Sequence, residues 1–365
     1  MEYKWKKDCK SFPGVYACDV LRANDYASCE DCKFYEPIKK ILIIKYGAAG
    51  DILRSTTILS KIRKKYGEVE IYWLVNERDR MLIDNNPEID KVFTFNWDEV
   101  LRLKQIKFKA LFSLEIDKKI CTVANEIDAE EKYGYYLDKE DNPTCFNEKA
   151  EYYLEKAWSD KLNKENRKTF QELLFDICEL EYEKDDYSFY LDEYEERLSE
   201  KLREDEDYVI GISIGAGGRW PSKALPKDRL MNLIREVHKL KRGKILLIGG
   251  IQESELKEEL VDELTEEGIK MKYVDRIELS TEDHIGAVAA SDLVICGDTL
   301  TMHIALALKK KTIGLFFCTP DWEIEGYDRL KKIVSPLLEK YFFTDEYVKE
   351  LINSIKIEDI TKEIK

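Results

Sequence analysis

The sequence predicts an α/β protein made of two Rossmann-like halves in succession. Short apolar runs of strand length alternate with stretches of helical spacing, which is typical of a parallel sheet covered by helices on both faces. This alternating series begins twice, and a long charged stretch separates the two series. The chain has 365 residues, 44% of them apolar. That is about twice the length of a typical domain, so two core-bearing units fit the chain.

The first half is predicted to cover residues 38–203. Its apolar runs predict strands at residues 41–44, 69–75, 91–95 and 110–116, and helical spacing predicts a helix over residues 52–66. Residues 148–203 are charged and have helical spacing. We expect them to complete this half and to lead into the next one.

The second half is predicted to cover residues 204–340. Strands are expected at residues 209–214, 244–248, 293–296 and 312–317, and helices at residues 228–240, 280–290 and 301–308. Residues 329–365 are charged and are expected to be mostly helical. Within them, we assign residues 341–365 as a helical brace.

Charge and composition exclude several classes of protein. Lys and Arg number 59 against 74 Asp and Glu, which gives a formal net charge of −15. A chain of this sign repels the phosphate backbone, so nucleic acid is not expected as a partner. No run approaches the ~18 consecutive apolar residues of a membrane-spanning helix. We therefore expect a cytoplasmic protein without a transmembrane segment, and peripheral contact with the inner face of a membrane stays open.

Residues 1–37 are predicted to form a separate cysteine-rich module. Four of the nine cysteines lie there, at positions Cys9, Cys18, Cys29 and Cys32. A Cys-x2-Cys pair with two further cysteines nearby can complete a tetrahedral metal site, and a metal would order a segment too poor in apolar residues to fold on its own core. We expect structural zinc, with iron or an iron–sulfur cluster as the second choice. Surface thiols and two disulfides are the alternatives.

Three loops follow predicted strands, and parallel sheets bind ligands at the carboxyl ends of their strands. The first loop contains Gly47, Gly50 and Asp51. Its small residues let another molecule approach the backbone, and Asp51 is interpreted either as the N-cap of the next helix or as a carboxylate base facing a cleft. The spacing leaves both roles open. Four basic residues of the first half are candidates for binding an anionic acceptor: Lys45, Arg54, Arg78 and Arg80.

The second loop covers residues 215–226. The amides of Gly217 and Gly218 can cradle a phosphate group, and Lys223 can add a positive charge. The alternative is a flexible loop with a solvated lysine.

The third loop, residues 297–305, opens directly into a helix whose amides would face an anion. Thr299 can donate a hydroxyl to the same anion. His303 is one of only three histidines in the chain. It is interpreted either as a packing residue or as a member of this phosphate site.

Several nucleotide and hydrolase motifs are missing from the sequence. It has no GxxxxGK[ST], so it is not a P-loop hydrolase, and no GxGxxG followed by an acidic residue, which argues against an NAD dehydrogenase.

Four segments, in order and spacing, resemble glycosyltransferase family 9, the ADP-heptose:lipopolysaccharide heptosyltransferases and their relatives. The segments are residues 43–54, 215–226, 247–250 with Glu253, and 297–305. The resemblance implies a GT-B fold, in which two Rossmann-like domains face each other across a cleft and a C-terminal helix returns to the first domain. The donor nucleotide sugar would bind mainly to the second domain, and a glycan or glycolipid acceptor to the first.

The resemblance also implies an inverting transfer that needs no divalent metal. Asp51 matches the family's proposed base, and Lys223 would stabilise the departing diphosphate. Met302 and His303 would line the diphosphate and sugar pocket, and Glu253 would contact the nucleoside. The full donor-binding set implied by the resemblance is Gly217, Gly218, Lys223, Glu253, Asp298, Thr299, Met302 and His303.

Two positions depart from the family pattern. Leu300 stands where the family often has glycine, and Leu225 where it often has tryptophan. Leu300 narrows a place where backbone should approach the ligand. ADP-heptose is the leading donor, and another nucleotide sugar is the alternative donor. The acceptor could instead be a protein. The alternative to an enzyme is a non-catalytic scaffold that binds a nucleotide sugar.

Overall fold

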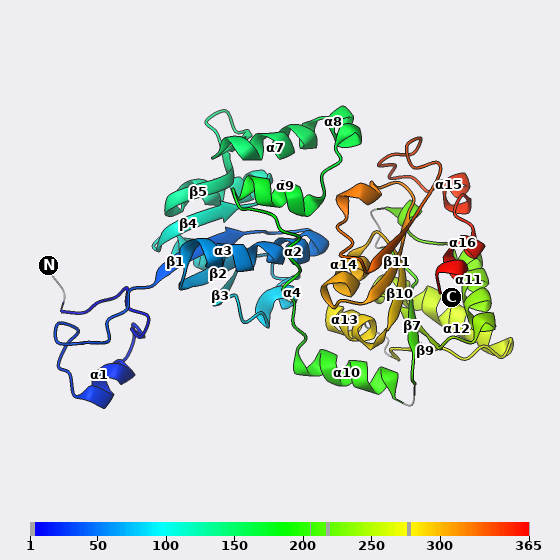
Figure 1. The fold of residues 1–365 in the computed structure, drawn as a ribbon, viewed down its shortest axis with the longest axis horizontal. Coiled ribbons are helices and arrows are strands. Elements are labelled where there is room, and N and C mark those ends of the chain that lie inside the picture. Colours follow the sequence, from blue (N-terminus) through cyan, green and yellow to red (C-terminus); the bar gives the residue numbers. More distant parts are fainter. Residues whose placement is uncertain (1–3, 205, 217–219, 276–278, 365) are drawn as a thin grey trace.

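The structure is a computed structural model that describes residues 4–204, 206–216, 220–275 and 279–364. Two α/β halves stand side by side, and a small N-terminal segment projects from the first half on the side away from the second (Figure 1). Each half is built on one six-stranded sheet. The predicted fold class of two Rossmann-like halves is therefore confirmed.

The sheet of the first half has the strand order β3-β2-β1-β4-β5-β6. All its pairs are parallel except β5 with β6. In β1, Ile41 and Ile43 pack into the core on one face of the sheet, whereas Leu42 and Ile44 pack into the core on the other. Both faces are thus buried, which explains the continuous apolar runs. The strands are β1 Lys39–Ile44, β2 Val69–Val75, β3 Lys91–Thr94, β4 Lys107–Ser113, β5 Asp128–Leu137 and β6 Pro143–Cys145.

Helices cover both faces of this sheet. The helices α2, α3 and α9 contribute to the core that holds Ile41, and α5 and α6 contribute to the core that holds Leu42. The helices of this half are α2 Ala49–Ser55, α3 Leu59–Tyr66, α4 Met81–Asp84, α5 Trp97–Leu103, α6 Lys118–Glu126, α7 Glu151–Trp158, α8 Asp160–Glu165, α9 Phe170–Ile177 and α10 Glu193–Arg203, with 3-10 turns at Thr56–Ile58 and Glu148–Ala150.

The second sheet is wholly parallel and has the order β12-β11-β10-β7-β8-β9. Counted from its first strand, this is the same Rossmann order as in the first half. Its strands are β7 Val209–Ser213, β8 Lys244–Ile248, β9 Lys272–Tyr273, β10 Leu293–Gly297, β11 Lys311–Phe316 and β12 Leu330–Val334. Its helices are α11 Lys227–Leu240, α12 Ser254–Glu266, α13 Thr281–Ala290 and α14 Leu300–Ala307, with 3-10 turns at Pro221–Lys223, Ile251–Glu253 and Asp321–Glu323.

The end of the chain differs from the prediction in two ways. It begins with a strand, β12, which forms an edge of the second sheet. The helices α15 Lys349–Asn353 and α16 Ile357–Thr361 and a last 3-10 turn, Lys362–Ile364, follow. Leu351 and Ile360 are fully buried in the same core as residues of α11, so these helices pack on the second half and do not return to the first.

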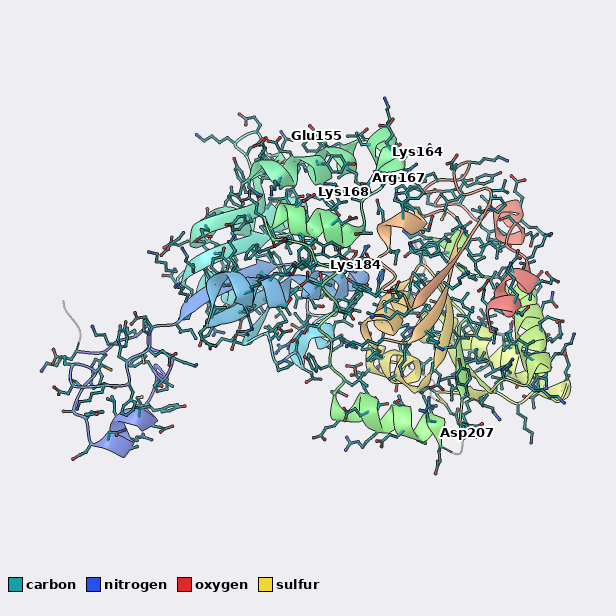
Figure 2. The ribbon with its side chains drawn as sticks, in the orientation of Figure 1. Glu155, Lys164, Arg167, Lys168, Lys184 and Asp207 are labelled. Carbon is teal, nitrogen blue, oxygen red and sulfur yellow. The ribbon has the colours of Figure 1, made fainter. Side chains whose placement is uncertain are left out.

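The connection between the halves is made by α10 and the segment before it. Helix α10 packs against α13 of the second half (Figure 1). At the opposite side of the boundary, Lys164 and Arg167 point across it: Arg167 lies 4.4 Å from the ring centre of Trp322, and Lys164 lies 5.7 Å from that of Phe342 (Figure 2). Contacts at both sides hold the halves together.

The N-terminal segment contains one short helix, α1 Asp19–Asn24. Its buried apolar residues are Cys18, Leu21 and Cys29. In the described part of the chain, no helix is long and apolar enough to span a membrane.

Candidate active site

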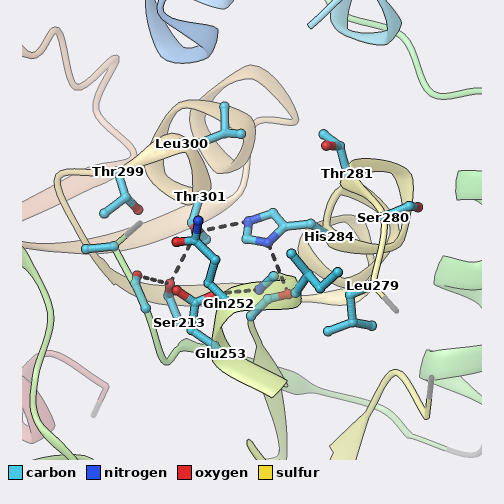
Figure 3. A pocket seen from close by; sticks show the side chains of 15 residues that line it. Ser213, Gln252, Glu253, Leu279, Ser280, Thr281, His284, Thr299, Leu300 and Thr301 are labelled. Carbon is cyan, nitrogen blue, oxygen red and sulfur yellow. Dashed lines mark hydrogen bonds between the residues drawn. The ribbon is translucent and has the colours of Figure 1, made fainter. Parts of the chain in front are cut away.

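A cavity of about 340 Å³ opens at the carboxyl ends of β7, β8 and β10, where the sheet order changes direction (Figure 3). Ligands of open α/β sheets bind at this switch point. The lining residues come from the loops after these strands and from the first turns of α13 and α14: Ser213, Gly215, Ala216, Gly249, Gly250, Ile251, Gln252, Glu253, Leu279, Ser280, Thr281, His284, Thr299, Leu300 and Thr301.

The wall of the cavity is organised by His284. Its two ring nitrogens lie 3.0 Å from the Thr301 hydroxyl and 3.4 Å from the Gly249 carbonyl oxygen. The Thr301 hydroxyl is also 3.2 Å from that of Ser213. Burial lowers the pKa of His284, so the ring is neutral at pH 7. This network joins helix α13 to α14 and to the end of β7.

Two further polar side chains of the lining, Glu253 and Thr299, have environments that bear on ligand binding. Glu253 accepts a hydrogen bond of 2.8 Å from the Gly250 amide, which fixes its carboxylate in the wall. Thr299 is the N-cap of α14, and among the described residues its buried hydroxyl has no hydrogen-bond partner. A hydroxyl left unpaired at a helix N-terminus is available to a bound anion, which the helix dipole also favours.

Lys223 and Asp298 form an ion pair beside the cavity. Lys223 Nζ lies 2.9 Å from Asp298 Oδ2, which also accepts a 2.7 Å hydrogen bond from Thr319. Burial raises the pKa of Asp298, but the cation of Lys223 outweighs burial and holds that pKa below its usual range. Lys223 lines a small second cavity that shares Ser213 and Gly215 with the larger one. The charge of Lys223 therefore lies just behind the wall of the larger cavity.

Asp51 lies in the first turn of α2, and the N-cap of that helix is Ala48. The N-cap alternative for Asp51 is therefore wrong. Its carboxylate forms an ion pair with Arg54 and lies 3.8 Å from Lys45 Nζ. Burial raises the pKa of Asp51, but these two cations outweigh burial and hold the pKa below its ordinary value. Asp51 is thus an ionised carboxylate on the first half.

Glu115 holds the loop that precedes α2. One of its oxygens, Oε1, accepts hydrogen bonds from Lys45 Nζ at 2.8 Å, from the Tyr46 amide at 3.0 Å and from the Gly47 amide at 2.9 Å. Lys45 is 5% exposed, and Glu115 balances its charge. Of the four basic residues considered as acceptor ligands, Lys45 and Arg54 pair with acidic groups of this cluster. Arg78 pairs with Asp79, and Arg80 pairs with Asp84.

His303 connects the residues around Asp51 in the first half with those beside the cavity in the second half. It lies on α14 of the second half and packs against Gly50 of α2, where a side chain would collide with its ring. Its Nε2 is 4.0 Å from Asp298, and its Nδ1 is 3.5 Å from the Tyr187 hydroxyl. Burial and the charge of Arg54 lower the pKa of His303 to about 4, so it is neutral at pH 7. Helix α2, which carries Asp51, therefore packs against α14, whose first residues line the cavity.

The remaining predicted residues do not all line the cavity. Met302 is 0% exposed in the apolar core and does not line the cavity, because it lies on the inner face of α14. Gly217 and Gly218 lie outside the described residues. Three participants were missed by sequence reasoning: His284, Thr301 and Glu115. The rarity of histidine was the one signal that could have pointed to His284, whereas Glu115 becomes visible only when β4 is placed beside β1.

Two facing Rossmann-like halves, with a cavity at the switch point of the second sheet and an ionised carboxylate on the first half, are the architecture of the GT-B class of glycosyltransferases. The sequence model of glycosyltransferase family 9 (heptosyltransferase) matches residues 103–345. The chain belongs to this family and is a glycosyltransferase.

Individual relatives agree with this assignment. The chain is 26% identical over 353 residues to lipopolysaccharide heptosyltransferase 1 of Campylobacter coli, a match that covers 89% of this chain and 98% of that protein. Two solved structures share the fold, each matching 89% of this chain. One is a family 9 glycosyltransferase of Veillonella parvula (TM-score 0.65, 15% identity, 95% of that chain), and the other is the ADP-heptose heptosyltransferase II of Escherichia coli (TM-score 0.65, 16% identity, 97% of that chain).

Proposed function

We propose that this enzyme transfers heptose from ADP-heptose to a lipopolysaccharide-type or other surface glycan and inverts the anomeric carbon. The observation that carries this proposal is that α2, which bears the ionised Asp51, packs on α14, whose N-terminal residues line the cavity of the second half. The names of the relatives support the substrate class, since one acts on lipopolysaccharide and another uses ADP-heptose. A lipid-linked acceptor would bring the enzyme to the inner face of a membrane.

In the proposed reaction, Asp51 accepts the proton of an acceptor hydroxyl while that oxygen attacks the anomeric carbon. The bond from this carbon to the diphosphate oxygen breaks, and ADP leaves with the electron pair. A single displacement of this kind inverts the anomeric carbon. The low pKa of Asp51 keeps it ionised and ready to accept a proton, although it also makes Asp51 a weaker base.

In this proposal, groups of the second half stabilise the negative charge that develops on the departing diphosphate. Thr299 and the N-terminus of α14 would donate hydrogen bonds, and Lys223 would supply a positive charge after exchanging Asp298 for phosphate. The amides of Gly217 and Gly218 belong to the same proposal. These groups perform the role that a divalent metal has in other transferases, so the proposed reaction requires none.

A second donor is favoured by one observation. The Leu300 side chain lines the cavity at the start of α14, where the family often has glycine. This side chain narrows the space next to the anion-binding amides. A nucleotide sugar other than ADP-heptose is therefore the second candidate.

Thermal shift distinguishes the donors. We expect ADP and ADP-heptose to raise the melting temperature of the full chain more than UDP or GDP at equal concentration, because a ligand that binds only the folded state stabilises it. Product mass spectrometry with each nucleotide sugar then identifies the transferred group. A clear preference for UDP or GDP would overturn the ADP assignment and support the second candidate.

Asp51→Asn tests the base. We expect transfer to fall by about 10²–10⁴-fold, while the ADP-induced thermal shift stays within error because the donor cavity lies on the other half. Asp84→Asn is the matched control: Asp84 pairs with Arg80 on the surface of the same half, and its loss should leave transfer unchanged. A fully active Asp51→Asn enzyme would contradict the assigned role.

A further inference from the structure

The N-terminal segment closes on itself through its backbone. Cys9 and Pro37 form a β-bridge, and the Cys29 amide donates to the Lys4 carbonyl over 3.1 Å. The Cys32 amide is 3.4 Å from the Cys29 carbonyl, so the Cys-x2-Cys pair forms a tight turn. The beginning, middle and end of residues 4–38 are therefore brought together.

All four cysteines of this segment line a single cavity of about 10 Å³. A volume of this size is about that of one water-sized probe. The other lining residues are Ser11, Phe12, Val20, Leu21, Phe34 and Tyr35. The four thiols, which come from three separate stretches of sequence, thus dominate the polar chemistry of this cavity.

The segment has almost no apolar core of its own. Its buried apolar residues are Cys18, Leu21 and Cys29, two of which are themselves cysteines. Segments of fewer than about 40 residues usually need disulfides, a metal or a partner to be ordered. All four cysteines are free thiols in this structure.

We propose that Cys9, Cys18, Cys29 and Cys32 bind one thiophilic transition-metal ion, zinc or iron, in a tetrahedral structural site. In the described part of the chain, no three His, Cys, Asp or Glu side chains are already arranged to hold an ion. The proposed binding therefore draws the sulfurs together by rotation about their side-chain bonds and releases the thiol protons. Four sulfurs fill a tetrahedral ion completely, so the site orders the segment and takes no part in transfer.

Metal analysis of the untagged full chain, purified anaerobically, tests this proposal. We expect about one zinc or iron per chain, from the four-thiolate site. Replacement by Co²⁺ should give the visible absorption of tetrahedral cobalt thiolate. Cys29→Ser and Cys32→Ser should each lose the metal. Cys145→Ser is the matched control, because this partly exposed thiol lies outside the segment and should leave the metal content unchanged.

A second measurement covers the case in which the serine variants do not fold. Titration of the wild-type chain with a mercurial reagent should release the ion as four thiols are consumed, without loss of the far-ultraviolet circular dichroism of the two large halves. The proposal is overturned if folded wild-type protein stays metal-free after reconstitution with zinc and with ferrous iron. It is also overturned if mass spectrometry shows two disulfides among these cysteines.

Discussion

Asp51 is held by two cations, and this arrangement sets the strength of the proposed base. Arg54 and Lys45 favour the ionised carboxylate, which lowers its pKa despite burial. The deprotonated form is the one that accepts a proton, so a low pKa keeps the enzyme active well into the acidic range. Each cation therefore makes Asp51 a weaker base but increases the fraction of Asp51 that is ionised at low pH.

Arg54→Met tests whether Arg54 lowers the pKa of Asp51. Removing the guanidinium should raise the pKa of Asp51, because an adjacent opposite charge typically lowers a carboxyl pKa by about 1–3 units. The acidic limb of kcat/KM should move to higher pH by about one unit or more. Arg80→Met, an exposed arginine of the same half, is the control and should leave the profile in place. An unshifted limb in Arg54→Met would show that Arg54 does not set the pKa of the base.

His303 makes the folded state sensitive to acid. Its pKa is about 4 in the folded chain against an ordinary 6.5, so between these values the unfolded state binds more protons. Stability therefore rises with pH in this window and is lost as pH falls from about 6.5 towards 4. The contribution of this residue between pH 6.5 and 5 is about 1.5 kcal/mol, because a full proton difference is worth about 1.4 kcal/mol per pH unit and the unfolded histidine is only half protonated at pH 6.5.

Urea unfolding of His303→Gln measures this contribution. The variant should lose about 1.5 kcal/mol less stability than wild type between pH 6.5 and pH 5, because glutamine does not titrate. His238→Gln, on α11, is the control and should follow the wild-type curve. Parallel pH dependence in wild type and His303→Gln would contradict the assignment.

The loop before α2 is positioned by an element that is distant in sequence. Glu115 follows β4, which pairs with β1, and it binds Lys45 and two successive loop amides. Glu115→Ala removes all three hydrogen bonds. We expect kcat to fall by about 10²-fold, because small displacements of a reacting group are costly. Glu115→Gln keeps an acceptor oxygen and should retain more activity.

Two readouts make this prediction specific to positioning. The ADP-induced thermal shift of Glu115→Ala should equal that of wild type, since Glu115 is outside the donor cavity. Glu126→Ala, which removes a surface ion pair with Lys104 on the same half, should leave kcat unchanged. Equal kcat values for the alanine and glutamine variants would argue against a role of the loop amides.

Some elements could be predicted from sequence, and the reasons are physical. The strands at the centres of both sheets are buried on both faces, so β1 and β10 appear as continuous apolar runs. Strands at the edge of a sheet or next to it lack this signal. Strand β5 is mostly half-exposed with the sequence DAEEKYGYYL, and β12 carries Lys331 and Lys332, so the first was missed and the second was assigned as helix.

The same reasoning limits what could be predicted of the site. A loop after a strand, such as the one with Asp51, could be found because its position depends on local sequence alone. The partners of Asp298 and His303 could not, because Lys223 and Tyr187 are 75 and 116 residues away in the chain. The first pair depends on the folding of the second half and the second pair on the packing of the two halves, and neither leaves a local sequence pattern.

At the scale of the whole molecule, the segment between α9 and α10 joins the site to the domain boundary. Asp186 on this segment forms an ion pair with Arg329 of the second half, and the neighbouring Tyr187 packs against Tyr327 with ring centres 5.7 Å apart. The Tyr187 hydroxyl faces His303. The relative position of the two halves is thereby coupled to the residues around Asp51.

Arg329→Met tests this coupling. The side chains of Arg329 and Asp186 are only 14% and 34% exposed, so losing the pair should cost about 1–3 kcal/mol of stability in urea unfolding. Because the proposed reaction joins substrates held on the two halves, kcat/KM should fall while the shift induced by ADP alone stays near that of wild type. Arg235→Met removes the pair with Glu267 within the second half and is the control, expected to preserve kcat/KM. If Arg329→Met keeps wild-type kcat/KM despite its lower stability, the ion pair stabilises the boundary without positioning the site.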